Sequence, residues 1–236
     1  MNGLRDALYD LQEFVLFHLY VLRNRLSFGF SKRPNLAIWL KRSHRDYQNI
    51  CRALDEPVLS KLANESPMRI LDVGSGSGAL ALALLEHLGG GNGASRWTYH
   101  GVDRMGASIR FGRRVFRSHP HVTFVCGDIA RDPVAPAHYQ LIVCFGTLLC
   151  LSTQDEYLRV FDKLLGGLAA PGCLFLGGIL TPECTYRYGR IALDVEDLLA
   201  RIDASRFSFR VLEENAFLRL QSYDPKARSL LVWRNG

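Results

Sequence analysis

A short run, residues 70–79, constrains the fold more than any other part of the chain. Its sequence, Ile-Leu-Asp-Val-Gly-Ser-Gly-Ser-Gly-Ala, joins an apolar strand-like stretch to an apolar helix-like stretch through three alternating glycines. Because Gly74, Gly76 and Gly78 lack a Cβ, the chain can turn tightly there, and main-chain N–H groups can approach a ligand at the start of the helix. The pattern predicts a strand–turn–helix unit that holds a ligand at its turn.

Two further strand-like runs end beside residues suited to ligand contact. The run 97–102 ends at Asp103, whose carboxylate can accept hydrogen bonds from both hydroxyls of a ribose. The run 122–126 is followed by Asp128 and Ile129, which suit the amino group and the ring face of an adenine. Ligands of open α/β sheets bind at the carboxyl ends of parallel strands, so these residues predict a single nucleoside-binding edge.

The glycine pattern alone leaves two cofactor classes open. Gly74, Gly76 and Ala79 also fit the G-x-G-x-x-G/A fingerprint of nicotinamide and flavin binders, which uses the same strand, turn and helix. A dinucleotide enzyme does not require the third element at Asp128 and Ile129, however. The ordered series therefore favours a single nucleoside that carries no pyrophosphate.

Taken as a series, residues 68–180 resemble the class I S-adenosylmethionine-dependent methyltransferases, which have a Rossmann-like, seven-stranded fold. The resemblance implies that S-adenosylmethionine is the cofactor. It also implies that the glycine loop holds the methionine portion, that the end of the second strand holds the ribose, and that the residues after the third strand hold the adenine. The cofactor-binding residues expected on this basis are Asp72, Gly74, Ser75, Gly76, Gly78, Asp103, Arg104, Asp128, Ile129, Cys144 and Phe145.

The remaining pattern fits the same fold class. Strand-like runs at 139–145 and 173–176 flank a helix-like stretch at 153–169 and a Pro171-Gly172 turn, and another helix is expected over about 192–203. Runs at 207–212 and 229–233 predict a terminal hairpin. We therefore expect a doubly wound, seven-stranded, mostly parallel sheet with an antiparallel last strand. Residues 1–66 are expected to form a helical lid and accessory segment, and residues 67–236 the methyltransferase domain.

The N-terminal segment is apolar on more than one face. The run from Phe14 to Leu22 is too short for the ~20 residues of a membrane span, and it contains His18. We expect this helix to pack on the core or on a second copy in a homodimer, with an interfacial membrane helix as the alternative. Charged residues also interrupt any cleavable signal, and the six cysteines form no metal-binding spacing, so a cytoplasmic protein is expected.

A net charge of +6 permits contact with nucleic acid. Basic residues cluster before the glycine loop and again after the second strand, with Arg110, Arg113 and Arg114 in the second cluster. No RNA-binding module accompanies them, so a solvated basic surface is the favoured interpretation. An RNA or protein methyltransferase remains one alternative function, and a catalytically silent scaffold with this fold is another.

Methyl transfer requires mainly geometry, so no nucleophile triad is expected. His44 and Tyr47, three apart on a helix expected over about 35–54, are candidate catalytic residues that would face the cofactor from the lid. The segment Cys144-Phe145-Gly146-Thr147 lacks the Asn/Asp-Pro-Pro-aromatic motif typical of amino-group methyltransferases that act on adenine or glutamine, and it lacks ligands for a divalent cation. We therefore expect a metal-free site for a small organic acceptor. Its candidate contacts are Thr147, Leu149, Glu183, Tyr186 and Tyr188.

Overall fold

The structure of the chain is a computed structural model, which describes residues 44, 46–54, 67–88, 97–179, 191, 193–213 and 227–235. The predicted substrate contacts Glu183, Tyr186 and Tyr188 lie outside the described residues, as do the N-terminal apolar helix and most of the expected lid.

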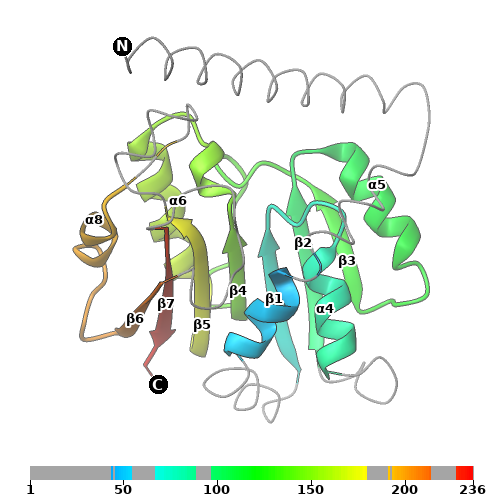
Figure 1. The fold of residues 1–236 in the computed structure, drawn as a ribbon, viewed down its shortest axis with the longest axis horizontal. Helices are drawn as coiled ribbons and strands as arrows, with labels where there is room; N and C mark the ends of the chain where they lie inside the picture. Colours follow the sequence, from blue (N-terminus) through cyan, green and yellow to red (C-terminus); the bar gives the residue numbers. More distant parts are fainter. Residues whose placement is uncertain are drawn as a thin grey trace, which may run out of the picture.

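One seven-stranded sheet organises the described residues, with the strand order β3-β2-β1-β4-β5-β7-β6 (Figure 1). The strands are β1 Met68–Val73, β2 Trp97–Asp103, β3 Val122–Cys126, β4 Tyr139–Phe145, β5 Leu168–Ile179, β6 Phe207–Glu213 and β7 Arg228–Arg234. The helices are α4 Ala79–Leu88, α5 Gly106–Val115, the 3-10 turn η3 Leu148–Cys150, α6 Gln154–Gly167 and α8 Val195–Leu199.

The strand order reverses beside β1, and ligands of open α/β sheets bind next to such a reversal. The chain proceeds outward from β1 through β2 to β3, and then returns to pair β4 with the other side of β1. Strands β1 to β5 are parallel, whereas β7 lies antiparallel between β5 and β6. The predicted fold class is confirmed, including the terminal hairpin. In such sheets the crevice forms where the order reverses, which is here the gap between the ends of β1 and β4.

Each face of the sheet buries its own apolar core. Helices α4 and α5 and the helical residues 46–54 cover one face, where Ile70, Tyr99 and Leu84 are buried together. Helices α6 and α8 cover the other face, where Leu71, Ile142 and Phe161 are among the buried residues. Successive strand residues point to opposite faces, so the neighbours Ile70 and Leu71 belong to different cores.

Two elements differ from the sequence-based expectation. Strand β5 begins at Leu168, directly after α6, so Pro171 and Gly172 lie inside the strand at an irregularity in its pairing with β4, and not in a separate turn. Helix α8 is shorter than the expected 192–203, because the hydrogen bonds after Leu199 tighten into three-residue turns such as Ile202 N–H to Leu199 O.

Part of the expected lid packs into the domain core. Residues 46–54 are helical, drawn blue in Figure 1, and the side chains of Tyr47, Ile50, Cys51 and Leu54 are buried. Among the described residues, no helix is long and apolar enough to span a membrane.

Candidate functional site

The glycine loop after β1 is fixed by main-chain hydrogen bonds. The N–H groups of Gly74 and Ser75 both donate to the carbonyl of Val102, at 2.8 and 3.1 Å, which ties the turn to the neighbouring strand. Gly74, Gly76 and Gly78 all have positive φ, a backbone conformation that favours glycine. Surroundings differ along the loop: a Cβ on Gly78 would lie 2.6 Å from the Phe124 ring, whereas a Cβ on Gly76 would meet nothing within 4 Å. The middle of the loop is therefore the part that is open to a ligand.

Beneath this loop, Asp72 is a fully buried carboxylate that is only half satisfied. Its Oδ2 accepts a hydrogen bond of 2.5 Å from the hydroxyl of Tyr99, on the adjacent strand β2, and Tyr99 is buried as well. Its Oδ1 has no hydrogen-bond partner among the described residues. Burial raises the pKa of Asp72 to about 7, with the hydrogen bond from Tyr99 acting in the opposite direction and the charge of Asp103 adding to the rise. A buried, unpaired carboxylate oxygen is costly unless a polar or cationic partner arrives.

Asp103, at the end of β2, links the glycine loop to the next helix. Its Oδ2 accepts a hydrogen bond of 2.9 Å from the N–H of Gly76, and its Oδ1 accepts one of 2.7 Å from the N–H of Met105. Each carboxylate oxygen can accept more than one hydrogen bond, so the side chain keeps capacity for a ligand hydroxyl. Arg104, the next residue, is exposed. The structure brings Asp103 into direct contact with the glycine loop, and the role of both in binding a cofactor stays a prediction.

The segment after β4 closes the other side of the crevice. Cys144 is fully buried and Phe145 partly buried, and Thr147 donates from its hydroxyl to the carbonyl of Val73 at 2.9 Å. That bond ties the end of β4 to the end of β1. Leu149 is buried in the turn η3. The predicted contacts Thr147 and Leu149 thus lie on this segment, with the Thr147 hydroxyl directed at β1.

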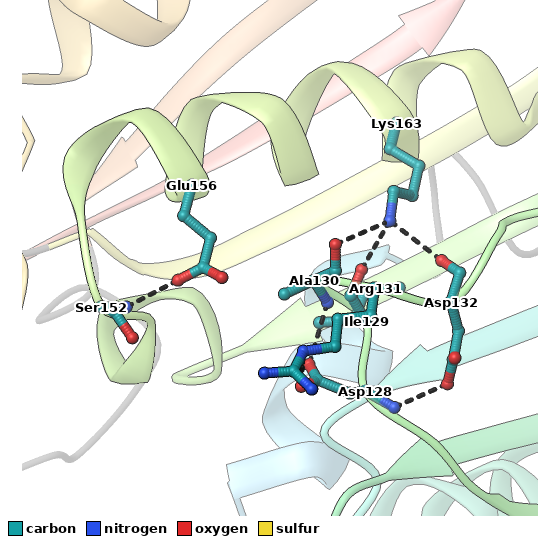
Figure 2. Close-up of polar contacts among 8 residues, drawn as sticks. All are labelled: Asp128, Ile129, Ala130, Arg131, Asp132, Ser152, Glu156 and Lys163. Carbon is teal, nitrogen blue, oxygen red and sulfur yellow. Dashed lines mark hydrogen bonds and ion pairs between the residues drawn. The ribbon is translucent and has the colours of Figure 1, made fainter.

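The segment after β3 is a single closed turn. Asp128 starts it: its Oδ1 accepts the N–H of Ala130 at 3.0 Å, and its carbonyl accepts the N–H groups of Arg131 and Asp132 (Figure 2). Ile129 is almost fully buried. Both predicted adenine contacts therefore lie on a preformed turn.

Tyr47 and His44 share a helix but have different surroundings. The buried ring of Tyr47 packs edge-on against Phe145, with 6.0 Å between ring centroids. Burial raises the pKa of Tyr47 well above its usual value, and the charge of Asp72 adds to the rise. His44 Nε2 instead lies 2.9 Å from Glu86 Oε2 on α4, within ion-pair distance but not aligned for a hydrogen bond. Of the two candidates, Tyr47 is the one beside the end of β4.

The residues that form this edge of the sheet match a known protein family. A family model described as a methyltransferase domain matches residues 70–172, which run from within β1 into β5. The sheet and its strand order are those of the Rossmann-like methyltransferase fold. No curated protein sequence matches it significantly.

Solved structures of methyltransferases share this fold at low sequence identity. A phosphoethanolamine N-methyltransferase from Haemonchus contortus is 14% identical, with a TM-score of 0.59 over 85% of this chain and 48% of that one. The CurJ carbon methyltransferase is 16% identical, with a TM-score of 0.54 over 79% of this chain and 52% of that one. The N-methyltransferase NodS from Bradyrhizobium japonicum WM9 is 18% identical, with a TM-score of 0.55 over 85% of this chain and 98% of that one. The chain thus spans about half the length of the first two structures.

Sequence reasoning missed two contacts of this candidate site. The first is the hydroxyl of Tyr99 on Asp72, and the second is Lys163 of α6, whose ammonium donates to carbonyls of the turn after β3. Both depend on strand register or helix placement, which no local motif carries. Among the residues that the structure describes, no group of three or more His, Cys, Asp or Glu side chains could hold a metal ion.

Proposed function

We propose that this protein is an enzyme that transfers the methyl group of S-adenosylmethionine to an O, N or C atom of a small organic acceptor, by direct in-line displacement without a metal ion. The observation that carries the proposal is the pairing of an open glycine turn at Gly76 with a buried, unpartnered oxygen of Asp72 beneath it. A ligand with a cationic group would satisfy that oxygen, and the open turn leaves room for it.

Residues at the ends of three strands would hold the cofactor. The glycine loop with Asp72 and Ser75 would take the amino acid portion, and the buried Ser75 hydroxyl, which has no hydrogen-bond partner among the described residues, supports this role. Asp103 would accept the ribose hydroxyls. Asp128 and Ile129 would line the adenine.

When bound, S-adenosylmethionine supplies a methyl group on a sulfonium centre, which is already a good leaving group. The protein then needs to align the acceptor atom and exclude water. Tyr47 and Phe145 would form the wall that does this, because their rings are in contact. With its pKa raised by burial, the Tyr47 phenol keeps its proton at neutral pH, so we assign it to orienting the acceptor by hydrogen bonding and not to removing a proton. A catalytic role for His44 stays a prediction.

A small acceptor is favoured by the apolar lining after β4. Phe145 is partly exposed and apolar, and Cys144-Phe145-Gly146-Thr147 carries no side-chain carboxylate or amide for a cation. One structure of similar fold is a complex of a phosphoethanolamine N-methyltransferase with phosphoethanolamine, which is a small acceptor. The five described cysteines are thiols and not halves of disulfides, which fits the reducing cytoplasm in which we propose that the enzyme works.

Methyl-labelled S-adenosylmethionine tests the proposal. The protein is incubated with a cell extract that has been separated into a dialysable fraction, an RNA fraction and a protein fraction. Label in the dialysable fraction alone, lost in a Gly76→Val variant that folds, is the expected result. Label confined to RNA or protein would contradict the small acceptor. No transfer into any fraction, together with no binding of S-adenosylhomocysteine, would contradict the enzyme and fit the silent scaffold.

A further inference from the structure

The ammonium group of a lysine binds the carbonyl groups of the turn after β3. Lys163, on α6, directs its ammonium at three main-chain carbonyls: Ile129 O at 2.8 Å, Ala130 O at 3.3 Å and Asp132 O at 2.9 Å (Figure 2). An ammonium has three N–H donors, so these three bonds use all of them. The lysine is only partly exposed, and its partners are carbonyls of one turn.

This turn resembles the last turn of a helix, and main-chain groups at both of its ends have hydrogen-bond partners. At its start, Asp128 accepts the N–H of Ala130, and Asp132 Oδ2 accepts the N–H of Asp128 at 2.7 Å. At its end, carbonyls without a main-chain partner would carry partial negative charge, and a cation stabilises such an end. Lys163 supplies that cation from a different element of the fold.

The turn has little freedom on its inner side. A Cβ on Gly127 would lie 2.6 Å from Asp132 Oδ2, so the main chain passes close under that carboxylate. The N–H of Gly127 donates to the carbonyl of Asp103 at 3.1 Å, which ties the turn to the end of β2. If the carbonyl end of the turn were not held, a movement of that end would therefore shift Ile129 relative to Asp103.

We propose that Lys163 is a positioning residue for the nucleobase subsite: it holds the main chain at Ile129 and Ala130 in the one conformation that binds adenine selectively. The inference rests on the proposed function, because it assumes that the turn contacts the base of the cofactor. Lys163 itself touches no cofactor atom in this account and acts through the carbonyls it binds.

Helix α6 is anchored at its other end, which makes a matched control available. Glu156 Oε2 accepts the N–H of Ser152 at 2.8 Å (Figure 2). The hydroxyl of Thr153 also accepts the N–H of Glu156 at 3.1 Å. Glu156→Ala would weaken the helix without touching the turn. Arg159, exposed on the same helix one turn before Lys163, gives a second control, since Arg159→Met removes one positive charge.

The test compares two ligands that differ only at the base. Titration calorimetry measures the dissociation constants of S-adenosylhomocysteine and S-inosylhomocysteine, in which a carbonyl replaces the adenine amino group. The wild-type protein is expected to prefer the adenine ligand, and Lys163→Met is expected to reduce that preference by about tenfold. Lys163→Arg should retain part of it, because a guanidinium keeps the charge but cannot donate three hydrogen bonds from a single nitrogen to the three carbonyls.

A structural role alone would lower both affinities together and leave their ratio unchanged, so an unchanged ratio in a folded Lys163→Met protein would overturn the proposal. An equal loss of preference in Glu156→Ala or Arg159→Met would overturn it too. Should Lys163→Met fail to fold, the shorter, neutral Lys163→Gln carries the same prediction. A wild-type protein that binds neither ligand would refute the proposed function itself, an outcome distinct from binding with an unchanged ratio.

Discussion

The Thr147 side chain fills the space that a Cβ on Gly74 would need, since such a Cβ would lie 1.8 Å from the Thr147 hydroxyl oxygen. Because that hydroxyl donates to the carbonyl of Val73, the absent Cβ is what lets the end of β4 bond to the end of β1. The glycine is thus required by a neighbouring side chain as well as by its positive φ.

Gly74→Ala should destabilise the fold by at least about 3 kcal/mol, through the clash and the positive φ together. In a Thr147→Gly background the clash is removed, so the cost of Gly74→Ala should fall by about 1–2 kcal/mol. Urea unfolding of the four proteins of this double-mutant cycle measures the difference. Equal costs in the two backgrounds would show that Thr147 does not restrict position 74.

Gly76→Ala should behave in the opposite way. No atom lies within 4 Å of the added Cβ, so stability should fall by only about 1 kcal/mol from the positive φ. The methyl group would instead occupy ligand space, and affinity for S-adenosylhomocysteine should fall by about tenfold or more. Thermal unfolding and calorimetry on the same preparation check both parts. A Gly76→Ala protein that binds normally would place the cofactor elsewhere.

Asp72 predicts an unusual dependence of stability on pH. Its pKa rises from 3.8 to about 7 on folding, so between those values the folded protein binds a proton that the unfolded chain has released. Stability must therefore fall as pH rises through this window, by at most about 4 kcal/mol, and level off above it. Asp72→Asn, which cannot ionise, should flatten the curve. Unfolding at about pH 5 and about pH 8 measures it, and a wild-type curve as flat as that of the variant would refute the buried carboxylate's role.

Tyr99→Phe should shift the pH dependence of cofactor binding. The Tyr99 hydroxyl stabilises the ionised form of Asp72, so its loss raises the pKa of Asp72 further. If the ionised carboxylate binds the cationic end of the cofactor, affinity rises with pH through about 7 in the wild-type protein and only at higher pH in Tyr99→Phe. The groups facing Asp72 from neighbouring elements are Tyr99, Asp103, Tyr47 and Cys144, and the pKa values of Tyr47 and Cys144 are both raised. Identical pH profiles for the two proteins would contradict this role of Tyr99.

Much of the fold could be predicted from local pattern. The bounds expected for the strands Val122–Cys126 and Tyr139–Phe145 are those observed, because each is a mainly apolar run followed by a glycine. The position of Asp103 at the same edge as the glycine loop could be predicted from the rule that parallel strands end at the same edge, whereas the hydrogen bond between them could not.

Contacts that depend on register could not be predicted. Tyr99 reaches Asp72 because Ile70 pairs with Tyr99 and Asp72 with Gly101, and parallel register is not encoded by either strand alone. His44 faces Glu86 because of how its helix packs against α4, which helical spacing does not specify. The β5 irregularity at Pro171 likewise results from pairing with β4 and β7.

A single nucleoside cofactor is proposed to bind across the ends of β1, β2 and β3. Titration calorimetry with S-adenosylhomocysteine, on the wild-type protein and on Asp103→Ala, tests this binding mode. We expect saturable binding at one site, weakened by about ten- to a hundredfold when the Asp103 carboxylate is removed. Absence of saturable binding, or an affinity that Asp103→Ala leaves unchanged, would refute the binding mode.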